Sequence, residues 1–414
     1  MEFRIEPRTK PGRKFCELAE DHSVEAAEHA ADHDRDGTFP SEVFASMKES
    51  GFLRATVPEE FGGLGVASAH DLGAGLARLA YGDGSTAIAA NMHLAFGLIG
   101  GRMLSAGREA GDEDQAGRMT AYLSLLGSGA IGMANVTESG TDIRHPLVEA
   151  TPVEGGWTIN GRKIFGTLSP LADIFFVPVR TPPDDEGHTA GFAIVFRGTA
   201  GQTILDNWDA LGMRASGSND IVYDDCVVPA ETLTIGGHWG EDDELSILVA
   251  TAGNEGLLGS FLGIAEAASE KAIAMATSRR KAPSGRLIAE RHGIQHQVAE
   301  MQTDLETCRA VIERVGRLLD FHLFDRRPSE VSLDELHQLN RTFQCAKLVA
   351  NRKAIDVVDR ALTISGGAGY MANSPLARLY RDVRAGPFMQ PLSPNEAYEY
   401  IGKVTLGLPP VLEA

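Results

Sequence analysis

The sequence predicts an α+β fold of several domains, in which a β-rich domain lies between two helical ones. Up to residue 127, apolar residues recur at helical spacing. Beyond that point, short β-branched and aromatic runs such as DIFFVPV and FAIVF are typical of strands. After residue 238, apolar spacings of three and four residues return. We therefore expect three domains, at residues 1–127, 128–238 and 239–414.

Composition excludes several classes of function. A net charge of −19 disfavours binding to phosphate backbones or anionic lipid, so we expect no nucleic-acid and no membrane partner. No apolar run approaches the roughly 20 residues of a membrane helix, and no secretory signal is visible. The 4 cysteines form no CxxC pair, which indicates reduced thiols and a cytoplasmic location. His29 and His33 are explained by an exposed acidic helix, so no metal site is expected.

Local patterns predict particular elements within the three domains. Asn160-Gly161 lies between strand-like runs and predicts a hairpin turn, because both turn positions need a positive φ. One long helix is predicted from Ile294 to Leu319, where apolar residues repeat in steps of four and three. A second helix is expected from Leu333 to Ile364, ending at a glycine pair. Such helices pack as a bundle.

Several short segments carry the functional signal, and each of them is weak alone. They are VTESGTD at 136–142, KIFGTLS at 163–169, DALGMRAS at 209–216, an arginine-rich stretch at 279–295, SGGAGY at 365–370 and Arg381-Asp382. In their order and spacing, these segments resemble the acyl-CoA dehydrogenase family over nearly the whole chain. The resemblance implies a flavin-dependent oxidoreductase with an N-terminal all-α domain, a central β-barrel-like domain and a C-terminal four-helix bundle. It also implies FAD between the last two domains.

The resemblance assigns four residues to the flavin ring. Val136 and Thr137 belong to the first loop, and Phe165 and Thr167 to the second segment. A fixed donor suits a reduced flavin, because negative charge near N1 then needs stabilisation. In the family, the far end of the first loop touches the acyl-CoA, which indicates Thr141 as a substrate-binding residue. The loop is two residues shorter here than in the family pattern.

The resemblance also assigns residues to the rest of the dinucleotide. An arginine pairs with the FAD pyrophosphate in the family, and its planar fork suits that task. The residues expected in this region are Arg280, His292 and Gln295. The glycine turn approaches a flavin held by the adjacent subunit, which implies a homodimer or homotetramer. The glycines concerned are Gly366, Gly367 and Gly369.

The expected catalytic base is missing from its usual place. In the family, a glutamate eight residues after the Arg-Asp pair removes the substrate α-proton. Counting from Asp382 places Gln390 there, and an amide has no basic site near neutral pH. Some family members carry the glutamate on an earlier helix, where this chain has Glu255. Glu255 is thus the candidate base, with a solvated helix position as its alternative.

Two reactions and one non-catalytic role remain open on this fold. The first reaction is α,β-dehydrogenation of an acyl-CoA or acyl-carrier thioester, with Glu255 or another displaced carboxylate as the base. The second is a reduced-flavin-dependent monooxygenase reaction through a flavin C4a-hydroperoxide, which needs no α-proton base. Gln390 and the shortened loop favour the second, and the retained motifs favour the first. A non-catalytic partner subunit is the third interpretation.

Overall fold

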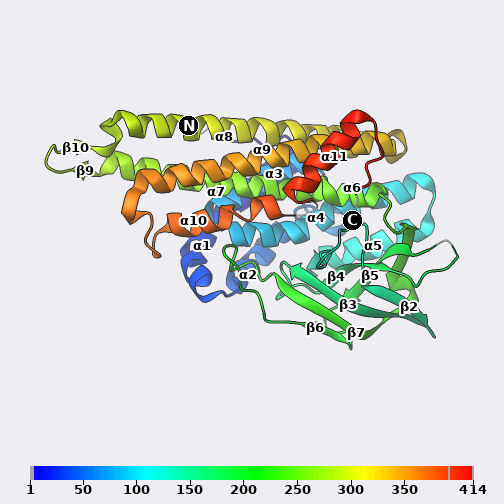
Figure 1. The fold of residues 1–414 in the computed structure, drawn as a ribbon. Coiled ribbons are helices and arrows are strands. Elements are labelled where there is room, and N and C mark those ends of the chain that lie inside the picture. Colours follow the sequence, from blue (N-terminus) through cyan, green and yellow to red (C-terminus); the bar gives the residue numbers. More distant parts are fainter. Residues whose placement is uncertain (1–3, 186, 390–391, 413–414) are drawn as a thin grey trace.

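The computed structural model describes residues 4–185, 187–389 and 392–412, and it has a β domain on one side of two helical layers (Figure 1). The N-terminal helices are α1 (Lys10–Asp36), α2 (Ser41–Ser50), α3 (Ala69–Gly82), α4 (Gly84–Ala110) and α5 (Glu113–Gly127). The C-terminal helices are α6 (Glu244–Ala250), α7 (Ala252–Ser278), α8 (His292–Leu319), α9 (Leu333–Ser365), α10 (Pro375–Val383) and α11 (Pro394–Leu406). The expected helical–β–helical order is confirmed.

Side chains at the helix ends explain where the helices begin and stop. Thr9 caps α1 by accepting a hydrogen bond from the Gly12 backbone N–H. Ser332 and Glu335 form a capping box at the start of α9. The helix ends at Gly366, which has a φ of 61°. The two long helices predicted from the apolar repeat therefore exist as α8 and α9.

The middle of the described chain forms one eight-stranded sheet. Its strands are β1 (Gly132–Ala134), β2 (Glu149–Val153), β3 (Gly156–Gly166), β4 (Ile174–Arg180), β5 (Thr189–Phe196), β6 (Gln202–Ile204), β7 (Asn219–Pro229) and β8 (Leu233–His238). The order is β6-β7-β3-β2-β4-β5-β8, with β1 paired to β4. Neighbouring strands are antiparallel, except that β4 is parallel to β1 and β2.

The hairpin predicted at Asn160-Gly161 is wrong. Both residues lie inside β3, and the turn from β2 to β3 is formed by Glu154 and Gly155, whose φ is 80°. At Gly161 the pairing of β3 with β7 shifts register, and the Asn160 side chain accepts a 2.8 Å hydrogen bond from the Asp225 N–H. The Asn-Gly pair therefore forms an irregularity in the sheet, and this irregularity needs a glycine with a positive φ, as a turn does.

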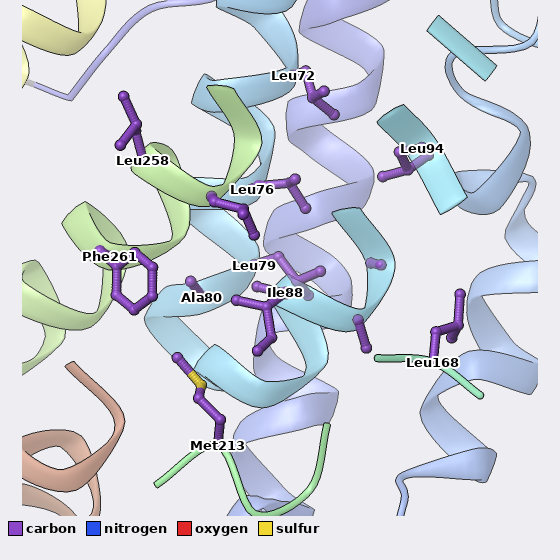
Figure 2. Close-up of a cluster of buried hydrophobic side chains, with 14 of the residues drawn as sticks. Leu72, Leu76, Leu79, Ala80, Ile88, Leu94, Leu168, Met213, Leu258 and Phe261 are labelled. Carbon is purple, nitrogen blue, oxygen red and sulfur yellow. The ribbon is translucent and has the colours of Figure 1, made fainter. Parts of the chain in front are cut away.

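The helical domains pack through a close contact between α3 and α7. A Cβ added at Gly259 would lie 2.0 Å from the Gly73 carbonyl oxygen, and one at Gly263 would lie 2.1 Å from that of Ala77. Only glycine fits at these positions. Figure 2 shows the resulting core, in which Leu76 of α3, Ile88 of α4 and Phe261 of α7 lie near Met213 from the β domain. The three domains thus share one hydrophobic core.

Two helical segments are long and apolar enough to cross a membrane by length and composition. They are Gly84–Ala110 and Glu244–Ser278, and 78% and 94% of their apolar windows are buried inside the molecule. The sequence analysis expected no apolar run of this length, but passing this test does not make either segment a membrane span. Both segments are instead core helices.

Candidate active site

One cavity of about 390 Å³ lies where the three domains meet. α4 contributes Ile88, Met92 and Phe96 to its walls. The β domain contributes Val136, Thr137, Ile143, Phe165, Thr167, Trp208, Leu211, Met213, Ser216 and Ser218. The C-terminal domain contributes Gly253, Asn254, Leu257, Arg381, Arg384, Phe388 and Met389. The lining is mostly apolar, and its few polar groups are hydroxyls, one amide and two guanidinium groups.

All four residues predicted to contact the flavin ring line this cavity, although they come from two segments. The Thr137 carbonyl accepts a 2.8 Å hydrogen bond from the Ile164 N–H, which joins the first loop to β3 beside Phe165. The next residue, Glu138, accepts hydrogen bonds from the backbone N–H groups of Leu147 and Val148 and from the buried ammonium of Lys163. Burial lowers the pKa of Lys163 to about 8, although the nearby Glu138 carboxylate acts to raise it. This buried pair fixes the loop to the sheet.

Phe165 presents an aromatic face at the opening of the cavity. Its side chain is 56% exposed although it is large and apolar. The Trp208 ring meets it edge to face, with centroids 5.9 Å apart. Phe165 also has a φ of 53°, a conformation that is strained for a non-glycine residue. Strained, exposed aromatic residues at a cavity mouth indicate a site that is built for a ligand.

A chain of three hydroxyl groups interrupts the apolar lining. The Thr167 and Ser218 hydroxyls are 2.8 Å apart, and the Ser218 and Ser216 hydroxyls are 2.6 Å apart. All three residues line the cavity. They supply hydrogen-bond donors and acceptors to a ligand without adding charge.

The loop before β7 is held against α10 by a buried carboxylate. The Met213 N–H donates a 2.7 Å hydrogen bond to Asp382, and burial raises the pKa of Asp382 from 3.8 to about 7, opposed by Arg378. A Cβ added at Gly212 would lie 2.3 Å from the Arg381 carbonyl oxygen, so the loop and helix backbones touch. This contact brings Leu211 and Met213 to the cavity.

Glu255, the candidate base, does not line this cavity. Its carboxyl is fully buried, and a Cβ added at Gly316 of α8 would lie 3.1 Å from its Oε1. Neither oxygen has a hydrogen-bond partner among the described residues. Burial, with Asp320 nearby, raises the pKa of Glu255 well above its ordinary value. The side chain is therefore buried between helices, where its uncharged form is favoured, and it is not a solvated helix residue either.

Gln390, the residue at the usual base position, lies outside the described residues. The segments on either side of it are anchored to α9. The Lys347 ammonium donates to the carbonyls of Met389 and Leu392, and Asn351 donates a 2.9 Å hydrogen bond to that of Gly386. Burial lowers the pKa of Lys347 to about 7. Lys347 thereby fixes the wall that Met389 contributes.

The remaining predicted residues lie away from the cavity. The Thr141 hydroxyl donates a 2.6 Å hydrogen bond to the His145 carbonyl within its own loop. Arg280, His292 and Gln295 are exposed, near the β9–β10 hairpin (Arg280–Lys281 and Arg286–Leu287) at one end of the bundle (Figure 1). The glycine turn after α9 lies at the same end (Figure 1). It comprises exposed Gly366 and Gly367, and buried Gly369. A contact between this turn and a neighbouring subunit's flavin stays a prediction.

Sequence reasoning missed most of the cavity lining. Trp208, Leu211 and Ser218 lie in or beside the DALGMRAS segment, which contributed to the family resemblance but to which we assigned no site residue. The α4 residues carry no motif, and only their apolar character marks them. Of the two arginines, Arg381 belongs to the Arg-Asp pair and Arg384 follows it, so the pair was a usable signal.

The residues of this cavity fit a flavin ring. A planar tricyclic ring needs apolar walls, an aromatic neighbour and a few polar groups at its edge, and these are present in the leucine and methionine side chains, in Phe165 and in the hydroxyls. Thr137 and Thr167 would hold the polar edge of the ring, and Phe165 would lie beside it.

Comparison with known proteins identifies the family. The acyl-CoA dehydrogenase N-terminal, middle and C-terminal domains match residues 14–119, 130–226 and 257–390. The amino sugar nitrososynthase DnmZ of Streptomyces peucetius is 34% identical over 97% of this chain and 95% of its own length. The L-evernosamine nitrososynthase of Micromonospora sp. is 34% identical over 97% and 92%.

Solved structures agree with this assignment. KijD3, in complex with FMN and dTDP-3-amino-2,3,6-trideoxy-4-keto-3-methyl-D-glucose, is 34% identical with a TM-score of 0.90, over 98% of this chain and 96% of that one. Butyryl-CoA dehydrogenase from Megasphaera elsdenii shares the fold, with a TM-score of 0.81 at 24% identity over 98% of this chain and all of that one. The expected flavin cofactor and oxidoreductase class are confirmed, and the non-catalytic interpretation is not. The chain belongs to the acyl-CoA dehydrogenase family of flavin-dependent oxidoreductases.

Proposed function

We propose that this enzyme is a reduced-flavin-dependent monooxygenase that oxidises the amino group of a nucleotide-linked amino sugar. The observation that carries the proposal is the chemistry of the cavity wall. Among the described residues that line it, none is an aspartate, glutamate, histidine, lysine, cysteine or tyrosine. Abstraction of an α-proton needs a positioned base, which is worth about 10² to 10⁴ in rate. The acyl dehydrogenation implied by the resemblance would find no such base among the described lining residues.

The proposed reaction is consistent with such a wall. An amine carries its own nucleophilic lone pair, so its attack on activated oxygen requires no carbon acid to be deprotonated. Bound reduced flavin supplies the two electrons that activate O2. One oxygen atom goes to the substrate nitrogen, giving a hydroxylamine, and the other leaves as water. The same stoichiometry applied to the hydroxylamine gives an N,N-dihydroxyamine and a second water, and loss of a third water from the dihydroxyamine leaves the nitroso compound.

The residues of the cavity have definable parts in this reaction. The apolar side chains of Ile88, Met92 and Leu257 exclude water, which protects a reactive oxidant from hydrolysis. The hydroxyls of Thr167, Ser218 and Ser216 hold protons within hydrogen-bond distance of one another. The nitrososynthase relatives support an amino sugar as the substrate, since two of them are named for amino sugars and the KijD3 complex holds one linked to dTDP.

The experiment mixes the purified enzyme, chemically reduced flavin and 18O2 with a dTDP-linked amino sugar. We expect a product that carries one 18O atom on nitrogen, detected by mass spectrometry. The matched control is the same nucleotide sugar with a hydroxyl in place of the amine, which should remain unchanged. In parallel, a panel of acyl-CoAs is mixed anaerobically with the oxidised enzyme. Flavin bleaching by an acyl-CoA, without 18O in the amino sugar, would overturn the proposal in favour of dehydrogenation.

A further inference from the structure

Three arginines lie along α10 and at its C-cap, and they differ in what they contact. Arg378 is paired with Asp83 and lies deep between the helices. Arg381 donates a 2.8 Å hydrogen bond to Asp34 of α1 and a 3.1 Å hydrogen bond to the Leu211 carbonyl. Arg384 lines the cavity at the C-cap of α10. Among the described residues, its side chain has neither a hydrogen bond nor an ion pair.

Other described arginines also have no side-chain partner, but Arg384 is the one of them that lines the cavity. The chain has 57 acidic residues against 38 arginines and lysines, so carboxylates are abundant. Both neighbouring arginines on the helix have one. Arg384 is only half-buried, yet the surface that it faces is the apolar lining, with no carboxylate in its described part. A cation in such surroundings is stabilised by an anion that enters with a ligand.

The chemistry of the group defines the anion. A guanidinium presents a planar fork of N–H donors that matches two oxygens of a phosphate. We propose that Arg384 forms a phosphate subsite of the cavity, which binds a phosphate or diphosphate oxyanion carried by a ligand of the active site. Two ligands could carry it, the nucleotide diphosphate of the substrate or the phosphate of the flavin. The nucleotide source rests on the proposed function, whereas the flavin source does not.

A simpler role for Arg384 is local. A cation at a helix C-terminus is favoured by the helix dipole by about 0.3 to 1 kcal/mol. That role predicts a small change in stability and no dependence of ligand binding on phosphate. Paired ligands that differ only in phosphate therefore separate the two roles.

The test measures dissociation constants and requires no turnover. Calorimetry compares dTDP with thymidine, and fluorescence titration of apo-protein compares FMN with riboflavin. We expect Arg384→Met to weaken dTDP or FMN by about 10- to 100-fold, as for loss of a charge-assisted hydrogen bond, and to leave the phosphate-free partner within about twofold. Arg384→Lys should recover part of the loss, because lysine binds phosphate as a point charge. Arg352→Met changes an exposed arginine of α9 and serves as the control.

Each outcome decides the question. A selective loss for dTDP assigns the subsite to the substrate, and a selective loss for FMN assigns it to the flavin. Equal loss of all four ligands, or no loss for either phosphate ligand, would overturn the proposal. If Arg384→Met does not fold, Arg384→Lys is used instead. The ratio of the affinities for dTDP and thymidine, and for FMN and riboflavin, is then compared with that of the wild type. Ratios equal to those of the wild type at both low and high salt would overturn the proposal. Failure of amine oxidation with a retained phosphate effect would count against the proposed function alone.

Discussion

The Met213 N–H donates a 2.7 Å hydrogen bond to the carboxyl of Asp382, which lies 169 residues further along the chain. This contact joins a loop of the β domain to a helix of the C-terminal domain. Met213 lines the cavity and has a φ of 52°, so the hydrogen bond holds a strained residue at the site. Because the charge of Asp382 changes with pH, the hydrogen bond that holds Met213 in the cavity wall also depends on pH.

Asp382→Asn should flatten the pH dependence of stability between about pH 4 and 7. Burial raises the pKa of Asp382 to about 7 in the folded chain, against an ordinary value of 3.8. The folded protein thus keeps a proton that the unfolded chain loses, so this contribution to stability is complete below pH 4 and is lost as pH rises towards 7. The slope removed is at most about 1.4 kcal/mol per pH unit. Urea unfolding at several pH values measures it, with exposed Asp359→Asn as the control.

Phe165→Ala should weaken flavin binding while leaving the fold intact. The ring is 56% exposed, so its removal creates no buried cavity. Aromatic pairs are worth about 0.5 to 1.5 kcal/mol beyond their buried area, which corresponds to a loss of about 2- to 10-fold in affinity. Fluorescence titration gives the dissociation constant and a thermal melt gives the stability. Phe196→Ala, at a 44% exposed phenylalanine of β5 outside the lining, should change neither.

Glu255→Gln should retain flavin binding and turnover within about twofold. The carboxyl is buried away from the cavity and burial raises its pKa, which favours the uncharged form, so an amide of the same shape replaces it closely. Steady-state kinetics with the amino sugar substrate and the acyl-CoA panel measure the effect, beside exposed Glu270→Gln. Loss of acyl-CoA bleaching in a folded, flavin-loaded variant would restore Glu255 as the base.

Lys347→Met should remove a rise of stability with pH above neutrality. Burial lowers the pKa of Lys347 from 10.5 to about 7, so between these values the unfolded chain holds a proton that the folded chain has released. Stability from this group therefore increases as pH rises from 7 towards 10.5, by up to about 1.4 kcal/mol per pH unit. Denaturant unfolding from pH 7 to 9 checks this, with exposed Lys271→Met as the control. A slope that persists in Lys347→Met would contradict the burial argument.

The sequence was sufficient for the parts of the molecule that depend on local pattern. The apolar repeat from Ile294 to Leu319 marks a helix because its period is 3.6, and the VTE and KIF segments mark the loops around Thr137 and Phe165 because motif and position agree. The hairpin at Asn160-Gly161 failed because a sheet irregularity requires the same positive φ as a turn.

The rest of the site depends on contacts between distant segments. Nothing near Asp382 in the sequence indicates that it accepts a hydrogen bond from Met213. Glu255 stands two residues from Gly253 and one from Asn254, both of which line the cavity, and the turn of the helix directs its side chain elsewhere. A difference of one position along the helix decides whether a side chain faces the cavity or the protein interior. Matching motifs without an alignment cannot place a residue that accurately.

Because α4, the β domain and the end of α10 each supply one wall, no single domain can hold a ligand in this cavity. The cavity comes into existence only when the three domains have docked, so bound flavin reports that assembly of the chain is complete. A ligand that binds only the docked state also stabilises it by mass action. We therefore expect added flavin during synthesis to raise the yield of assembled protein as well as its activity.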